Sequence, residues 1–137
     1  MAPIRIELAT NDADKLLVLE DIERFSDGSG YMAHLRVHST WLTFTHKFSF
    51  HELRLIDAIS NLTKMAKGEP AAAKLMGEWE SDFLQVELND LGHVYVTGEI
   101  GYEGGPDFQH VSFSFRTDQT VVPPLLRDLT KLLDNSI

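Results

Sequence analysis

The six histidines are the residues of this chain most able to bind a metal or move a proton. His34 and His38 fall on a predicted strand with Arg36 between them, which separates their rings by roughly 13 Å. His46 lies alone on the apolar side of the next predicted strand, so we expect a buried, hydrogen-bonded histidine. No H-E-x-x-H motif occurs, and the absence of cysteine excludes thiolate zinc sites. The sequence predicts no metal site.

Motifs for nucleotide binding and for nucleophilic catalysis are also missing. The chain contains no G-x-x-x-x-G-K-[ST], no G-x-G-x-x-G and no G-x-S-x-G. The glycine-rich segments 28–30 and 101–105 contain no lysine, and they are typical of turns rather than of anion sites. Acid–base work by Glu78, Glu80 and Asp82 would need a pocket, which strand spacing alone does not supply. We therefore expect no catalytic residue, no cofactor and a non-enzymatic protein.

Charge is distributed unevenly along the chain. The formal net charge is −9, and residues 75–115 contain no lysine or arginine but eight carboxylates. This balance argues against nucleic acid and anionic membranes as partners, because both attract Lys/Arg surfaces. The carboxylates serve either solubility or an acidic face for a basic partner.

Hydrophobic periodicity predicts alternating strands in the first half, followed by a helix. Residues 16–22 fit a strand or a short helix, and 31–37 with 42–50 form a hairpin around residues 39–40. Ser49 and Glu52 match a capping box for a helix over about 50–67, with Gly68 just after its end. Trp41 is either an exposed interface anchor or a core residue.

The second half has the same outline without repeated side-chain identity. The spacing predicts strands over 74–79, 84–88, 94–100 and 111–115, a loop over 101–107, and a helix over about 120–135 capped by Asp118 or Thr120. Together the patterns predict a single α+β domain over residues 1–137, with a largely antiparallel sheet of about six to eight strands and two amphipathic helices. The N-terminus lacks a signal-peptide pattern and no apolar run approaches a membrane span, so we expect a cytoplasmic protein.

The Gly-His-Val-Tyr-Val-Thr-Gly segment over 92–98 and the Asp-Gln-Thr segment over 118–120 resemble the WapI-like family of bacterial immunity proteins. The resemblance extends over roughly residues 30–135. It implies that the chain binds and neutralises the toxic domain of a polymorphic toxin, often a nuclease. A nuclease surface is basic, so its contacts are expected among the carboxylates of residues 75–115: Glu78, Glu80, Asp82, Glu87, Glu99, Glu103 and Asp107.

Three other functions remain open at this stage. The chain could be an interaction module without a toxin partner. It could also be an enzyme or small-molecule binder with a site between sheet and helices, for which His46 is the first candidate. It could also be a homodimer that uses an exposed sheet edge or face. The sequence leaves open whether the protein is a monomer or a homodimer.

Overall fold

The computed structural model describes residues 4–8, 10, 14–40, 42–77 and 81–135. In these ranges the chain forms two successive units, each a four-stranded antiparallel meander followed by a helix. The first unit forms sheet A and helix α1: β1 (Ile4–Leu8), β2 (Leu16–Arg24), β3 (Gly30–His38), β4 (Thr43–His51) and α1 (Glu52–Ala66). The second forms sheet B and helix α2: β5 (Ala71–Met76), β6 (Phe83–Leu88), β7 (Val94–Gly104), β8 (Asp107–Thr117), a 3₁₀ turn (Gln119–Val121) and α2 (Val122–Asp134).

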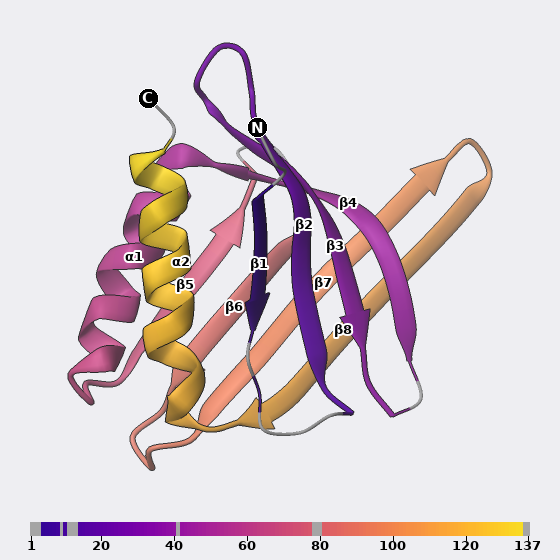
Figure 1. The fold of residues 1–137 in the computed structure, drawn as a ribbon. Coiled ribbons are helices and arrows are strands. Elements are labelled where there is room, and N and C mark those ends of the chain that lie inside the picture. Colours follow the sequence, from indigo (N-terminus) through magenta and orange to yellow (C-terminus); the bar gives the residue numbers. More distant parts are fainter. Residues whose placement is uncertain (1–3, 9, 11–13, 41, 78–80, 136–137) are drawn as a thin grey trace.

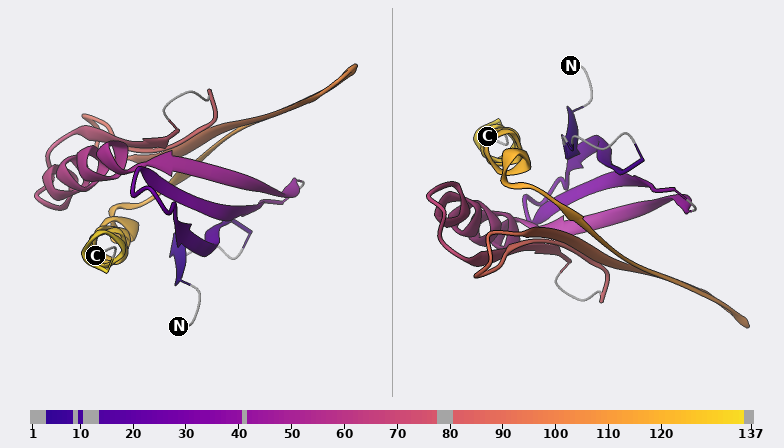
Figure 2. Two further views of the ribbon diagram at one scale, coloured as in Figure 1. Left: turned by 90° about the horizontal axis from the view of Figure 1, so that it is seen from above. Right: turned by 90° about the horizontal axis from the view of Figure 1, so that it is seen from below.

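The predicted α+β class, with about six to eight largely antiparallel strands and two helices, is confirmed, and the described residues form eight strands. The strands are divided between two sheets, which pack face to face with the helices along one side (Figures 1 and 2). Helix α1 packs beside β5, α2 packs beside β1, and the helices contact each other. The predicted helices over about 50–67 and 120–135 correspond to α1 and to the turn plus α2. Within the described ranges neither helix is long and apolar enough to cross a bilayer.

One apolar core joins both sheets and both helices. Alternate residues of each strand enter it, as the period-two pattern requires. Leu35 of β3, Leu55 and Leu62 of α1, and Val94 of β7 are fully buried in it. Burial of each such side chain contributes roughly 1.5–3 kcal/mol, so this core fixes the relative position of the two sheets.

Residues 16–22, which fit either a strand or a helix in sequence, belong to strand β2. Its register with β3 shifts between Glu20 and Glu23, and Asp21 takes a φ of 52°. This bulge changes the phase of the alternation, so that Ile22 as well as Leu17 and Leu19 enters the core. The ambiguous spacing in sequence is the signature of that bulge.

The predicted capping box at Ser49 is wrong. Strand β4 continues through Ser49 to His51, which pairs with Gly30, so Ser49 lies inside the sheet. His51 is the N-cap instead, and its Nδ1 accepts a hydrogen bond of 3.3 Å from the amide of Leu53. The helix end agrees with expectation, because Gly68 follows the C-cap with a φ of 83°.

The predicted loop over 101–107 is also wrong. Strands β7 and β8 stay paired to Gly104 and Asp107, leaving only Gly105 and Pro106 as the turn. Gly105 takes a φ of 61°, as the first central residue of a type II′ hairpin turn does. The glycines that indicated a loop are therefore strand residues up to the turn itself.

The strand predicted over 74–79 is described as Ala71–Met76. Residues 78–80 and Trp41 lie outside the described ranges, so the question raised for Trp41 is not addressed.

Candidate functional site

Strands β7 and β8 extend beyond the rest of sheet B. The last register pair between β6 and β7 is Phe83 with Glu99, whereas β7 and β8 remain paired to the turn. Residues 100–111 therefore form a two-stranded projection, which we call the hairpin arm. Both views in Figure 2 show it reaching well outside the two-sheet body. The arm is the most prominent surface feature of the described chain, and it is the part best placed to meet another molecule.

Two large side chains are exposed on this arm. Tyr102 is 49% exposed and Phe108 is 66% exposed. The Phe108 ring lies parallel to that of His110, with 6.4 Å between centroids. Tyr102 lies along the strand against Gly104, where a Cβ atom would collide with its ring and hydroxyl. Exposed aromatic side chains on a projection are typical of interface anchors.

Four of the predicted contact carboxylates gather at the arm and its base. Glu103 and Asp107 lie on the arm, and Glu103 pairs with Phe108 across the hairpin. Asp82 accepts a 2.9 Å hydrogen bond at Oδ1 from the amide of Gly101, which ties the segment before β6 to the arm. Glu99, at the base, accepts a 3.2 Å hydrogen bond from the Ser112 hydroxyl. We define the arm surface by these acids and the two exposed aromatics: Asp82, Glu99, Glu103, Asp107, Tyr102 and Phe108.

Glu87 lies apart from this group. Glu87 is paired with Tyr95 and Ala72. It lies four residues along β6 from Phe83, which is paired with Glu99. At about 3.3 Å per residue that separation is roughly 13 Å, which exceeds the screening length at physiological salt. Glu78 and Glu80 lie outside the described residues. The structure thus brings four of the seven predicted carboxylates together.

Two cations also share the outer face of sheet B. The Nζ atom of Lys74 lies 4.2 Å from the centroid of the Phe83 ring, and Arg116 Nη2 lies 3.2 Å from His93 Nε2. Both residues are just outside the cation-free stretch in sequence, but strand register places them opposite Gln85 and Tyr95. The strongly acidic region is therefore the arm end of the sheet rather than its whole outer face.

A groove of about 600 Å³ runs between sheet A and the arm. His46 lines it and is only partly buried, so the prediction of a buried core histidine is wrong. Strand β4 contributes Lys47 as well, which faces a groove that also contains Asp82 and Glu103. The other described lining residues are Met32, Ser49, Ser81, Gly101, Tyr102, Phe108 and His110.

Sequence reasoning missed Tyr102, Phe108 and Lys47 as site residues. The available signal was the alternation of Ile100 with Tyr102 and of Phe108 with His110, which continues up to the Gly105-Pro106 turn. Such alternation favours a long hairpin over a loop. Lys47 lines the groove because of how the two sheets pack against each other, and no local sequence pattern predicts that packing.

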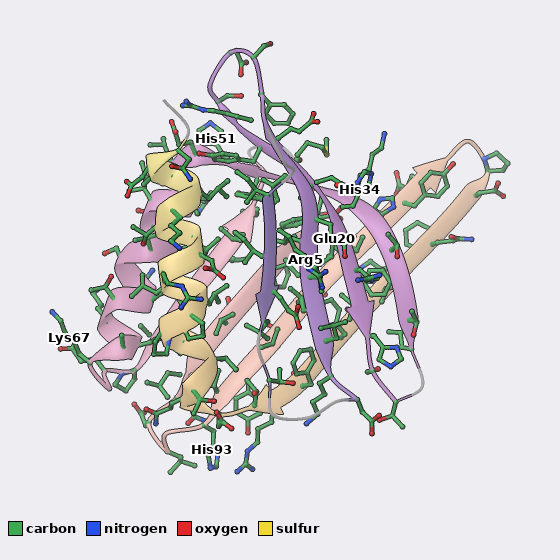
Figure 3. All side chains as sticks on the ribbon, viewed as in Figure 1. Arg5, Glu20, His34, His51, Lys67 and His93 are labelled. Carbon is green, nitrogen blue, oxygen red and sulfur yellow. The ribbon has the colours of Figure 1, made fainter. Side chains whose placement is uncertain are left out.

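The rest of the described chain offers little for chemistry. No group of three or more His, Asp and Glu residues in the described ranges is arranged to hold a metal ion. Figure 3 places His34, His51 and His93 in three separate parts of the molecule. The Nδ1 atom of His34 lies 3.3 Å from Oδ2 of Asp21. The cavity inside the core measures about 40 Å³ and has an almost entirely apolar lining. That is far below the roughly 300 Å³ of a small-molecule pocket.

Comparison with known proteins gives no match: no family model, no curated protein sequence and no solved structure matches this chain. The functional assignment therefore depends on the geometry of the arm surface.

Proposed function

We propose that this chain is a non-catalytic protein-binding domain whose arm surface binds a basic protein. The observation that supports this most is the coincidence of two exposed aromatics and four carboxylates on a projecting hairpin and its base. In the described part of the chain, the ion pairs found involve none of these four acids. Their charge is therefore available to a partner.

The two kinds of side chain supply different parts of the binding energy. Exposed aromatic rings gain affinity when a partner buries them, because they have large surfaces and few rotatable bonds. Carboxylates in solvent add little affinity individually, but they raise the association rate with a basic surface. A domain that must find its partner quickly gains from having both on one projection.

The partner we propose is a toxin domain that acts on nucleic acid, in line with the resemblance to WapI-like immunity proteins. Such a domain must have a basic substrate surface, since it holds a polyanion. An acidic arm that occupies this surface would block the substrate without chemistry. With a net charge of −9, the chain is not expected to bind nucleic acid itself. We place this activity in the cytoplasm, where a producer cell needs protection.

The test is co-expression with the toxic C-terminal domain of a large secreted protein encoded immediately upstream, with growth as the readout. The arm variant Glu99→Gln/Glu103→Gln/Asp107→Asn removes three carboxylates. The matched control Asp57→Asn/Glu69→Gln/Asp134→Asn removes three exposed carboxylates on or next to the helices, with the same change in net charge. We expect the wild type and the control to rescue growth and the arm variant to rescue it poorly.

Binding kinetics provide the quantitative form of this test. At low salt the arm variant should associate about tenfold more slowly or worse, and its rate should depend less on salt than that of the control. Equal rates and equal salt dependence for both variants would show that the arm does not meet the partner. Soluble wild-type protein that neither binds nor rescues would remove the toxin as partner.

A further inference from the structure

The two sheets have four edge strands, and three of them are protected. Helix α2 packs beside β1, and helix α1 packs beside β5. Strand β4 has the cation Lys47 near its middle and borders the groove. Covering helices and edge lysines are devices that prevent unwanted strand pairing. Strand β8 is the fourth edge, and among the described strands it pairs only with β7.

Strand β8 has none of the usual protections over most of its length. It has eleven residues, and its register with β7 is continuous without a bulge. From Asp107 to Phe115 it contains no proline, lysine or arginine. A long, regular and nearly uncharged edge of this kind is a template for another strand.

The limits of the free edge follow from the hairpin geometry. In a two-residue hairpin the pair that flanks the turn is hydrogen-bonded, so the odd-numbered residues from Asp107 onward direct their backbone groups to β7. Even-numbered residues then direct theirs outward. Consistent with this, the Arg116 carbonyl accepts a 3.0 Å hydrogen bond from Lys15 Nζ, which comes from another part of the chain. Lys15 occupies the Arg116 end of the edge, and within the described part of the chain no other backbone hydrogen bond reaches the outer side of residues 107–115.

We propose that a second copy of this chain pairs with β8 in antiparallel orientation, centred on Val111. Val111 is the midpoint of the free segment 107–115, so two antiparallel copies centred on it pair over the whole length of the segment. Val111 then meets its own counterpart, and Phe108 lies opposite Ser114 of the partner subunit. The pairing joins the two B sheets into one continuous sheet. It uses Phe108 and Asp107 of the arm surface, so a copy engaged in the dimer does not offer these two residues to the basic partner.

Charge and side-chain size favour this orientation. Asp107 is the one acidic residue on the free segment. Antiparallel pairing places the two copies of Asp107 at opposite ends, roughly 26 Å apart, whereas parallel pairing would place them side by side. Ser112 and Ser114 are small and exposed, which leaves room for the 66% exposed Phe108 ring of the other copy. An edge contact of this size supports a dissociation constant on the order of micromolar.

The primary measurement is sedimentation velocity of the full chain from about 1 µM to about 1 mM, a range that brackets this affinity. We expect a reversible monomer–dimer equilibrium. In Ser112→Pro the lost amide is one that points away from β7, so the monomer fold is kept while the edge is blocked. This variant should weaken dimerisation at least about tenfold, with unchanged circular dichroism, and Ser112→Thr should dimerise like the wild type.

Disulfide trapping provides a second test that does not depend on the proline variant. The chain has no cysteine, so Val111→Cys introduces a single thiol. Directly opposed residues that are not hydrogen-bonded to each other across antiparallel strands have Cα atoms about 4.5 Å apart, within disulfide range. Air oxidation should cross-link Val111→Cys far faster than Thr45→Cys, an exposed position on β4. A wild type that stays monomeric at about 1 mM, a dimer unaffected by Ser112→Pro, or equal cross-linking of both cysteine variants would overturn the proposal.

Discussion

Gly98 supports the base of the hairpin arm, and replacing it with alanine should destabilise the protein. A Cβ atom at Gly98 would lie 2.5 Å from Cζ of Phe113 and 3.1 Å from Cδ2 of Leu84. The Phe113 ring is held in turn by Phe44, 6.0 Å away between centroids, and by Phe115, 6.3 Å away. We expect Gly98→Ala to cost about 1–3 kcal/mol, as overpacking does. For a domain of this size that corresponds to roughly 3–10 °C in melting temperature.

A double-mutant cycle in urea isolates the cause of this loss. Phe113→Leu shortens the ring that meets the new methyl group, so Gly98→Ala should cost about 1 kcal/mol less in that background. Gly30→Ala is the contrasting case, because its Cβ would collide with the backbone carbonyl of Phe50. No side chain can be trimmed to relieve that collision, so a loss of about 3 kcal/mol or more should persist in any background. Strict additivity of Gly98→Ala and Phe113→Leu, or a Gly30→Ala protein as stable as the wild type, would refute this reasoning.

Two further changes test local structure elsewhere. Asp118 accepts a 2.9 Å hydrogen bond from the Thr120 amide before α2. In urea titrations, Asp118→Ala should lower the free energy of unfolding by about 1 kcal/mol, and Asp118→Asn should lower it much less. An equal loss in both variants would show that the cap hydrogen bond is not the cause. In the β2–β3 turn, the Ser29 hydroxyl and amide donate to Asp27 and lower the pKa of its carboxyl. The resulting stabilisation is present above the unfolded pKa of about 3.9 and is lost as pH falls through the lower folded pKa. The stability difference between wild type and Asp27→Asn should therefore shrink with acidification, and a pH-independent difference would contradict this.

Periodicity was sufficient to predict the class of the fold because most core residues follow a simple alternation. It failed where the chain departs from regular pairing. The bulge at Asp21 blurred β2, and the glycines of 101–105 suggested a loop although only Gly105 takes a left-handed φ. Ser49 matched a capping motif, but pairing of β4 with β3 kept it in the strand. In each case tertiary pairing overrode a local preference.

The candidate site was less accessible to prediction than the fold. The absence of Lys and Arg over 75–115 indicated an acidic face, and four of the seven acids named for it gather at the arm and its base. Linear sequence does not show which residues register brings in from outside that stretch, and Lys74 and Arg116 entered the same sheet face in this way. Linear sequence also does not show that β7 and β8 extend beyond the end of β6. This extension exposes Tyr102 and Phe108.

The division of the chain into two meander–helix units has a consequence for folding. Each of the described strands pairs only with its neighbours in sequence, so sheet formation closes only short loops. Such low contact order favours rapid folding for a protein with eight strands. Contacts between distant parts of the sequence arise when the two sheets pack face to face and the helices dock across the two units. Because the exposed segment 67–70 joins those units, we expect fragments cut there to reassociate through the shared core and reconstitute the native protein.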